Sequence, residues 1–434
     1  MKILIKNGLV VTVNKNDEIK KMDILIENDE IKFLGDYNGP YDKLINAENK
    51  VIMPGLINTH THLGMSIFRG TSDGLPLMSW LNDKIWPIED KLTSKDIYYS
   101  NLISCIEMIK TGTTMCNDMY FGVDEGIKAI IESKIRCVYT RCLNDPDEFG
   151  DRKIEEFLEM YNKYKDTNPL ITFSVAPHSM YTCSYNYLEK LKKIADKNNL
   201  LIHIHSSENL EEMNTIKEKY NMTPIELLNK LGYLNNKLVI AHGTYITDND
   251  ILLLKNKNVS ISHNPISNLN LGCGVAPIKK LIDNNINVSL GTDGQGSGNN
   301  LNMFNHMGYV DLLQKGFNQN AKALDAYEVI KMATINGAKA LNVDNIVGSI
   351  EIGKKADIII LDMNNIEIYP TVNLIFDIVH NVSINNIETT IINGNILMEN
   401  HKLLLDINIE EVKQNIEKIL KKTPFAYYGT SKRR

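Results

Sequence analysis

A short apolar segment ends in a pair of histidines in the stretch Pro54-Gly55-Leu56-Ile57-Asn58-Thr59-His60-Thr61-His62. Residues at positions i and i+2 of a strand point to the same side of it, with their Cβ atoms roughly 6–7 Å apart. Two imidazoles at that separation can converge on one metal ion. The competing interpretation is that one histidine is a core residue and the other is exposed. The rest of the chain decides between them, because a metal site needs further ligands.

Beyond this stretch, apolar runs of strand length alternate with amphipathic segments of helix length. The further expected strands are residues 113–116, 137–140, 171–176, 201–205, 238–241, 259–262 and 288–291. Helices are expected between most of them, for example at 94–110, 153–164, 187–197 and 248–255. Together with the strand that ends at His60, this gives eight strand–helix units. Such a pattern favours an α/β fold of the (β/α)8 TIM-barrel type over a doubly wound sheet.

Both ends of the chain show short β-type runs instead. Those near the start are 3–5, 9–11, 23–26 and 31–34, and those near the end are 348–361, 387–392 and 395–397. Asn-Gly, Asn-Asp and Gly-Asp turn signals separate the runs near the start, as in a small all-β unit. We therefore expect one composite β-sandwich domain built from both chain ends. The expected boundaries are residues 1–53 for its first part, 54–345 for the metal-dependent barrel, and 346–434 for its second part with a C-terminal helix.

The composition of the chain narrows the classes of function. Of its 434 residues, 43% are hydrophobic and 23% are charged, which is typical of a globular protein. The formal net charge of −6 disfavours a nucleic-acid partner, because phosphate-binding surfaces carry a basic excess. The first residues are too charged for a signal peptide, and no apolar run approaches the ~20 residues of a membrane span. Six cysteines without a CxxC spacing indicate free thiols in a reducing cytoplasm. We expect a cytoplasmic enzyme and leave its oligomeric state open, a homo-oligomer included.

Barrel geometry predicts where the chemistry lies. Catalytic groups of (β/α)8 barrels lie at the carboxyl ends of the strands, where the following loops begin. The polar residues that close the expected strands are His60, His62, Asp118, Arg141, His178, His205, His242, His263 and Asp293. We expect these side chains to gather at one end of the barrel.

Two further metal ligands come from this set. In Leu201-Ile202-His203-Ile204-His205, we place His203 one layer deeper in the barrel interior and assign His205 to the metal. Asp293 lies between glycines at a strand end, where its carboxylate can be a fourth ligand and can accept a proton from water. Three imidazoles and one carboxylate suit Zn²⁺ or Fe²⁺ and leave a coordination position for water.

Hydrolysis also needs an acid and a base. Glu208 follows His205 by three residues, and zinc deaminases of another fold use a non-ligand glutamate as their proton shuttle. His242 closes the next strand and is placed to hold or deprotonate the attacking water. The plain structural alternative for Glu208 is an exposed acid in the first turn of a helix, a position that acids favour.

Four segments in order resemble the amidohydrolase superfamily. They are His60-Thr61-His62, the segment from His205 to Glu208, Ser262-His263-Asn264-Pro265-Ile266-Ser267-Asn268, and Gly291-Thr292-Asp293-Gly294. Within it, the chain is most similar to the 5′-methylthioadenosine/S-adenosylhomocysteine deaminases, over nearly its whole length. The split β domain with its turn Gly353-Lys354-Lys355-Ala356-Asp357 is part of the resemblance.

This resemblance implies a reaction and a set of roles. It implies His60, His62, His205 and Asp293 as ligands of one divalent ion, zinc first and iron second. Glu208 would be the proton shuttle at the purine ring, with His242 and Asp293 acting on the water. The expected reaction is hydrolytic deamination of 5′-methylthioadenosine, S-adenosylhomocysteine, 5′-deoxyadenosine or adenosine to the inosine analogue and ammonia. The segment Ala176-Pro177-His178-Ser179 at the fourth strand favours a mononuclear site.

The residues that bind the substrate are also expected from the resemblance. Glu89 and His178 would hold the ribose hydroxyls, since a carboxylate can accept two hydrogen bonds. Arg141 could pair with the homocysteine carboxylate, unless it forms a structural ion pair at the barrel rim. Further candidates are Trp80, Ser297 and, as a second positive charge, Arg152 or Lys153.

Two alternatives remain open at this point. An enzyme of the same fold could act on a free base or another heterocycle of the guanine, cytosine, pterin or triazine type. Departures from the family pattern at residues 270–274 and in the glycine-rich segment 295–298 border the expected pocket and bear on this choice. The second alternative is a non-catalytic barrel that serves as a scaffold, which the retained ligands and acid disfavour.

Overall fold

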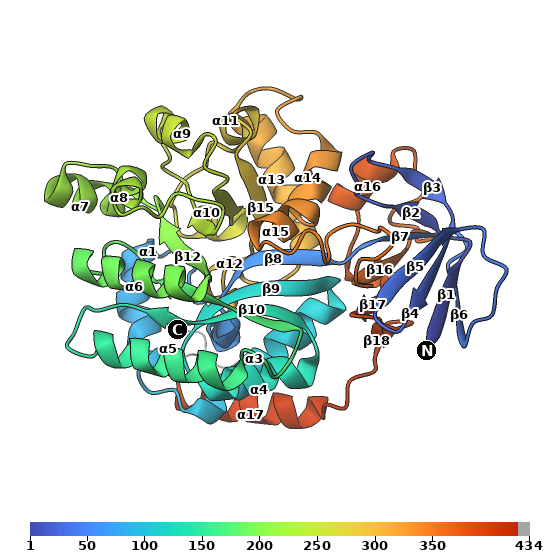
Figure 1. The fold of residues 1–434 in the computed structure, drawn as a ribbon, viewed down its shortest axis with the longest axis horizontal. Coiled ribbons are helices and arrows are strands. Elements are labelled where there is room, and N and C mark those ends of the chain that lie inside the picture. The colour runs from blue at the N-terminus through green and yellow to red at the C-terminus, as the bar shows by residue number, and fades with distance from the viewer. Residues whose placement is uncertain (424–434) are drawn as a thin grey trace, which may run out of the picture.

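The computed structural model describes residues 1–423 and contains a barrel of eight parallel strands with a β sandwich beside it (Figure 1). The barrel strands pair in sequence order, each with the next. They are β8 (Leu56–Thr61), β9 (Thr113–Tyr120), β10 (Arg136–Leu143), β11 (Ile171–Pro177), β12 (Leu201–Ser206), β13 (Leu238–His242), β14 (Ser260–His263) and β15 (Asn287–Leu290). The (β/α)8 barrel expected from the alternating pattern is confirmed.

Helices follow the strands and surround the barrel. After β8 come η1 (Leu63–Phe68), α1 (Leu77–Trp80), η2 (Leu81–Ile85), α2 (Trp86–Glu89) and α3 (Ser94–Lys110). The next strands are followed by α4 (Val123–Ser133), α5 (Gly150–Tyr164), α6 (Tyr185–Asn198), α7 (Leu210–Tyr220), α8 (Pro224–Lys230), α9 (Asp248–Leu254), α10 (Pro265–Asn270) and α11 (Ile278–Asp283). After β15 come α12 (Gln295–Gly298), α13 (Met303–Phe317), α14 (Ala326–Met332) and α15 (Ile335–Ala340). Within residues 1–423, no helix is long and apolar enough to span a membrane.

The first and last barrel strands, β8 and β15, meet at a seam. The Asp293 N–H donates to the His60 carbonyl at 3.0 Å, and the Thr59 hydroxyl donates to the Leu290 carbonyl at 2.9 Å. A Cβ on Gly291 would lie 2.7 Å from the His60 Cβ, so only glycine allows this approach. The seam therefore places Asp293 directly beside the histidine pair of β8.

Two further sheets form the β sandwich, shown at the right of Figure 1. One has the order β5-β4-β1-β6, with β1 (Lys2–Lys6), β4 (Asp23–Glu27), β5 (Glu30–Gly35) and β6 (Lys43–Asn46). The other has the order β19-β18-β17-β16-β7-β2-β3, with β2 (Leu9–Val11), β3 (Ile19–Lys21), β7 (Lys50–Pro54), β16 (Ile358–Asp362), β17 (Ile387–Ile392), β18 (Asn395–Glu399) and β19 (Lys402–Leu403). Isoleucines from both sheets, such as Ile24 and Ile358, share one buried core. The second sheet joins strands from both chain ends.

The remaining elements lie in the C-terminal part of the chain. They are α16 (Leu374–His380), η3 (Ile384–Asn386) and α17 (Ile409–Lys422), the last of which packs against α3 beneath the barrel in Figure 1. Residues 424–434, which belong to the expected third segment, lie outside the described residues. The boundaries 1–53, 54–345 and 346–434 stay a prediction.

Two expectations about strand ends were wrong. Asp118 and Arg141 were expected to close their strands, but β9 runs on to Tyr120 and β10 runs on to Leu143. The reason is that polar side chains do not interrupt the backbone pairing of a parallel sheet. Asp118 pairs with Tyr139, and Arg141 pairs with Tyr120, in continuous register.

Candidate active site

The carboxyl ends of the strands bring the predicted metal ligands together. The Asp293 Oδ1 lies 3.2 Å from the His62 Nε2 and 3.4 Å from the His60 Nε2. The His205 Nε2 lies 3.2 Å from the His62 Nε2. His60 belongs to β8 and His205 to β12, His62 directly follows β8, and Asp293 lies three residues beyond the end of β15. The four residues therefore form one cluster, although they span more than half of the chain.

The histidines of this cluster are oriented by contacts on their far nitrogen atoms. The Nδ1 of His62 lies 2.5 Å from the carbonyl of Met119, and the Nδ1 of His205 lies 2.6 Å from the carbonyl of His178. A carbonyl only accepts, so each Nδ1 carries a proton, and each Nε2 is the nitrogen that faces the cluster. His60 is supported by His203, whose Nε2 lies 2.9 Å from its Nδ1.

Burial sets the charge of the cluster. It lowers the pKa of His60 to about 4 and holds the pKa of His205 well below its usual value, so both are neutral, as metal ligands must be. For Asp293, burial opposes ionisation, but hydrogen bonds with His60 and His62 outweigh it and hold its pKa well below the usual range. For His62, the same Asp293 contact overcomes burial and raises the pKa to about 9. A metal ion would replace the His62 proton.

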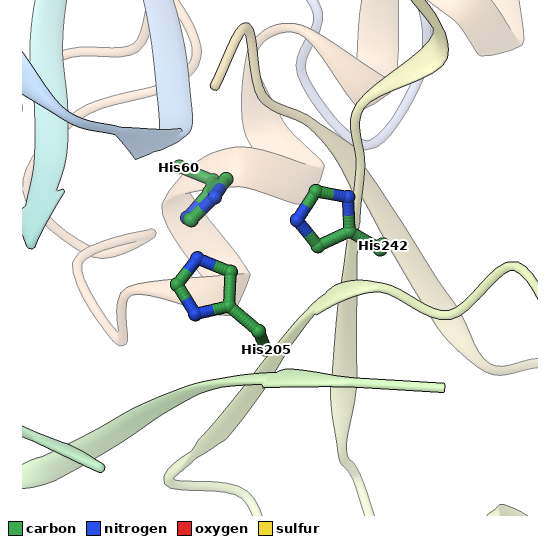
Figure 2. Close-up of side chains that lie close together, drawn as sticks. All are labelled: His60, His205 and His242. Carbon is green, nitrogen blue, oxygen red and sulfur yellow. The ribbon is translucent and has the colours of Figure 1, made fainter. Parts of the chain in front are cut away.

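His242 adds a fourth imidazole, whose ring centre lies 5.3 Å from that of His60. Figure 2 shows the rings of His60, His205 and His242 facing one another, and their nearest ligand nitrogens all lie within 4.8 Å. A second group within this limit is His60, His62 and Asp293. The four ligands predicted from the sequence are divided between these two groups. Their assignment as ligands, with His242 left for the water, stays a prediction.

Glu208 and His242 lie next to each other beside the cluster. The Glu208 Oε1 lies 3.6 Å from the His242 Nε2, and both side chains are buried. Burial raises the pKa of Glu208, which favours the protonated form that a proton donor needs. The Nδ1 of His242 lies 2.8 Å from the Oδ1 of Asn268, which orients its ring. Glu208 is therefore not the exposed acid of a first helical turn that was the alternative interpretation.

The residues expected to bind the substrate have the following contacts. Glu89 is half-buried, and its Oε1 accepts a hydrogen bond from the Tyr120 hydroxyl at 2.7 Å. Burial raises the pKa of Glu89 to about 7. The ring centre of His178 lies 4.8 Å from that of His205. The Ser297 hydroxyl donates to the Oδ2 of Asp293 at 2.9 Å.

The four other candidates each have a partner of their own. Arg141 donates from Nε to the Glu156 carboxylate at 2.7 Å, and Arg152 lies 3.3 Å from the same carboxylate. The structural ion pair that we left open for Arg141 is therefore present. Trp80 is buried, and its indole N–H donates to the Thr71 hydroxyl at 3.0 Å. Lys153 lies 2.9 Å from the Asn144 side-chain oxygen, away from Glu156.

Several contacts of the site had not been singled out in the sequence. Ser267 donates to the Oδ2 of Asp293 at 2.7 Å, and Tyr120 contacts Glu89. Ser267 lies in the quoted segment 262–268, so the motif contained the signal but not the partner. Tyr120 closes a strand and could have been found by extending β9. No sequence signal pairs it with Glu89.

Comparisons with known proteins place the chain in one family. The profile of the amidohydrolase family matches residues 51–397. A 5-methylthioadenosine/S-adenosylhomocysteine deaminase of Thermoanaerobacter pseudethanolicus is 41% identical over 96% of this chain and 98% of the relative. A 5′-deoxyadenosine deaminase of Methanosphaera stadtmanae is 43% identical over 94% of this chain and 96% of the relative. The crystal structure of an adenosine deaminase from Xanthomonas campestris with bound zinc has a TM-score of 0.93 and 28% identity, covering 97% of this chain and 98% of that one.

Proposed function

The chain belongs to the amidohydrolase family and is a metal-dependent hydrolase, and from this premise we propose that it deaminates 5′-substituted adenosines. The products are the corresponding inosine analogue and ammonia. Relatives at 41% and 43% identity carry the names 5-methylthioadenosine/S-adenosylhomocysteine deaminase and 5′-deoxyadenosine deaminase. The observation that carries the proposal is the buried Glu208–His242 pair beside the histidine–aspartate cluster.

The cluster fits a single zinc ion. The His60 Nε2 is buried 3.4 Å from the Asp293 Oδ1, and the surrounding donors are imidazole nitrogens and this one ionised carboxylate, the donors that zinc prefers. We propose His60, His62, His205 and Asp293 as its ligands. An ion held there would supply a water molecule that is deprotonated near neutral pH.

The other residues of the site move protons and orient the water. In the proposed reaction, the water oxygen forms a bond to C6 of the purine, and the C6–N bond to the amino group breaks. Asp293 and His242 hold the water and take up its proton. Glu208, whose pKa burial raises, donates a proton to the leaving nitrogen, which departs as ammonia. The water thus replaces the amino group, and the proton balance closes within the site.

We propose that the sugar and its 5′ substituent bind across β9, β10 and β11. Glu89 and His178 would hold the ribose hydroxyls, with Trp80 and Ser297 at the edge of the pocket. Arg141 would meet the carboxylate of S-adenosylhomocysteine, exchanging its Glu156 partner for the substrate. Arg141 already forms a charge-assisted pair with the carboxylate of Glu156, and we propose that the substrate carboxylate takes the place of this partner.

The test is to assay a panel of adenine nucleosides and free purines as substrates. Turnover is measured by the absorbance change on conversion to the hypoxanthine form. We expect turnover of the nucleosides, and a loss in kcat of about 10²- to 10⁴-fold in Glu208→Gln with its metal retained. Arg141→Leu should raise KM for S-adenosylhomocysteine by about tenfold or more and leave KM for 5′-deoxyadenosine unchanged. Turnover of free bases alone, or full activity of Glu208→Gln, would contradict the proposal.

We also propose a cytoplasmic location and a small-molecule partner. All six cysteines are free, and thiols persist in a reducing compartment.

A further inference from the structure

Helix α7, which follows Glu208, begins differently from three other helices around the barrel. In α3, α8 and α9, the acid three residues into the helix accepts the backbone N–H of the threonine that caps it. In α7 the cap is Asn209, and its side chain accepts the Glu212 N–H at 2.8 Å. The Glu212 Oε2, however, lies 2.8 Å from the backbone nitrogen of Glu208, one residue before the cap. The first turn of α7 thus binds the backbone of Glu208, the proposed proton shuttle.

The loop that carries Glu208 is held from two directions. The carbonyls of Ser206 and Ser207 accept the N–H groups of Gly243 and Tyr245, at 3.2 and 2.8 Å, from the chain that follows β13. Ser207 has a φ of +55°, a left-handed conformation that side chains other than glycine rarely adopt. Such a conformation persists only where the surroundings fix it. The Glu208 N–H, which follows directly, is fixed by the buried Glu212 carboxyl.

We propose that Glu212 is a positioning residue, whose carboxyl oxygen fixes the backbone of Glu208 so that the Glu208 side chain faces His242 and the metal-ligand cluster. This inference rests on the proton-shuttle role proposed for Glu208. Within the described part of the chain, the Glu212 carboxyl forms no hydrogen bond or ion pair with the metal-ligand cluster. Its effect on the reaction must therefore pass through the loop that carries Glu208, where it contacts the N–H groups of Glu208 and Ser207.

The contact matters because the Glu208 carboxyl stands at the end of a flexible side chain. A displacement of about 1 Å at a catalytic group can reduce a rate by about 10²-fold. A buried N–H without an acceptor is unfavourable. Without the Glu212 carboxyl, the loop would have to change conformation for the Glu208 N–H to reach another acceptor. Burial raises the pKa of Glu212 to about 8, so at neutral pH it offers an acceptor oxygen without a charge. A glutamine at this position would offer the same acceptor.

The experiment compares Glu212→Ala, which removes the acceptor, with Glu212→Gln, which keeps it. We expect Glu212→Ala to lower kcat for 5′-deoxyadenosine by about 10- to 100-fold, with KM changed less than about threefold and the bound metal unchanged. Glu212→Gln should stay within about threefold of the wild-type kcat. If the alanine variant does not fold, Glu212→Asp replaces it, because a side chain one methylene shorter cannot reach the Glu208 N–H.

A matched control comes from α8, where Glu226 accepts the Thr223 N–H at 2.7 Å in the ordinary capping arrangement. Glu226→Ala should lower Tm without changing kcat. In a Glu208→Gln background, Glu212→Ala should cause no further loss, since both changes act on one group. The inference is overturned if Glu212→Ala keeps the wild-type kcat, if Glu212→Gln loses as much as alanine, or if Glu226→Ala lowers kcat equally.

The two proposals fail in different ways. Full activity of Glu208→Gln removes the proton-shuttle role, whatever Glu212 does. An inactive Glu208→Gln together with a fully active Glu212→Ala removes only the positioning role.

Discussion

The charge of a single residue, Glu212, links the stability of the protein to pH. Its pKa is raised from the ordinary 4.5 to about 8 by burial, while the N–H groups of Glu208 and Ser207 lower it only in part. The unfolded chain loses this proton near pH 4.5, and the folded chain keeps it up to about pH 8. The stabilisation that the protonated group contributes is therefore full below pH 4.5 and is lost as pH rises toward 8.

This direction of the pH dependence gives a prediction for Glu212→Gln, because the glutamine side chain cannot ionise. Between these pH values, the free energy of unfolding of the wild type should fall relative to the variant by at most about 1.4 kcal/mol per pH unit. Urea unfolding of both proteins at several pH values measures the difference. The other titratable groups around Glu212, namely Glu208, Tyr181 and Cys273, are present in both proteins and largely cancel. A difference that does not change with pH would show that Glu212 titrates normally.

At this scale, the sequence predicted which residues gather but not what holds them. The pair at 60 and 62, with His205, His242 and Asp293, followed from strand periodicity and barrel geometry. The contacts that orient these residues could not be predicted from the sequence. Their acceptors include backbone carbonyls such as that of Met119, and the residue type says nothing about what its carbonyl binds. Glu212 had the ordinary signature of a helix N-terminus, and only the structure shows that it contacts Glu208 instead of the cap.

Among the elements, one buried ion pair joins the start of β10 to the β sandwich. Arg136 donates to both oxygens of Asp357, at 2.9 and 3.0 Å, and to Asn393 at 3.2 Å. The Asp357 carboxylate also accepts the Asn393 N–H at 2.7 Å. Removing one partner leaves the other charge buried without a counter-ion, which typically costs about 3–5 kcal/mol.

We predict that Arg136→Ala lowers the free energy of unfolding by about 3–5 kcal/mol and leaves kcat unchanged, because β10 begins at the end of the barrel remote from the site. Chemical denaturation measures the first and the nucleoside assay the second. Arg136→Lys should recover only part of the loss, since lysine cannot bind two oxygens side by side. Lys163 and Asp124 are a suitable control, an exposed pair at 2.7 Å whose loss should cost less than about 1 kcal/mol. An equal cost for both pairs would contradict the prediction.

The elements themselves were largely predictable, because hydrophobic periodicity follows burial. The helix expected at 94–110 is α3 without change, since Thr93 and Asp96 cap it reciprocally. The ends of β9 and β10 were not predicted correctly. A polar residue in the sequence suggests the end of a strand, but buried polar residues such as Asp118 lie within the strand. The composite sandwich followed from β-type runs at both ends, but the pairing of β16 with β7 is a long-range contact that no local pattern specifies.

In the whole molecule, the proposed metal site lies across the seam of the barrel. His60 and His62 belong to the first barrel strand and its end, Asp293 follows the last strand, and His205 comes from β12 between them. The hydrogen bonds that join the seam include Thr292 N–H to the Asn58 side chain at 3.0 Å and Asp293 N–H to the His60 carbonyl. An ion bound by these residues ties the two edges together. A ligand that binds only the folded state stabilises it by mass action, and here it does so at the closure.

Metal removal should therefore lower the local stability of the barrel more at the seam than elsewhere. We predict that chelation abolishes turnover, lowers Tm, and speeds hydrogen exchange of the Thr292 and Asp293 amides by at least about tenfold, which corresponds to about 1.4 kcal/mol of local stability. Amides between β10 and β11, such as Cys137 N–H bonded to the Leu170 carbonyl, should change much less. Added zinc should restore both protection and activity, whereas magnesium should not, because it prefers oxygen ligands. If exchange rises equally around the whole barrel, the ion stabilises the fold globally, and if it does not rise at the seam, the ion is bound by other residues.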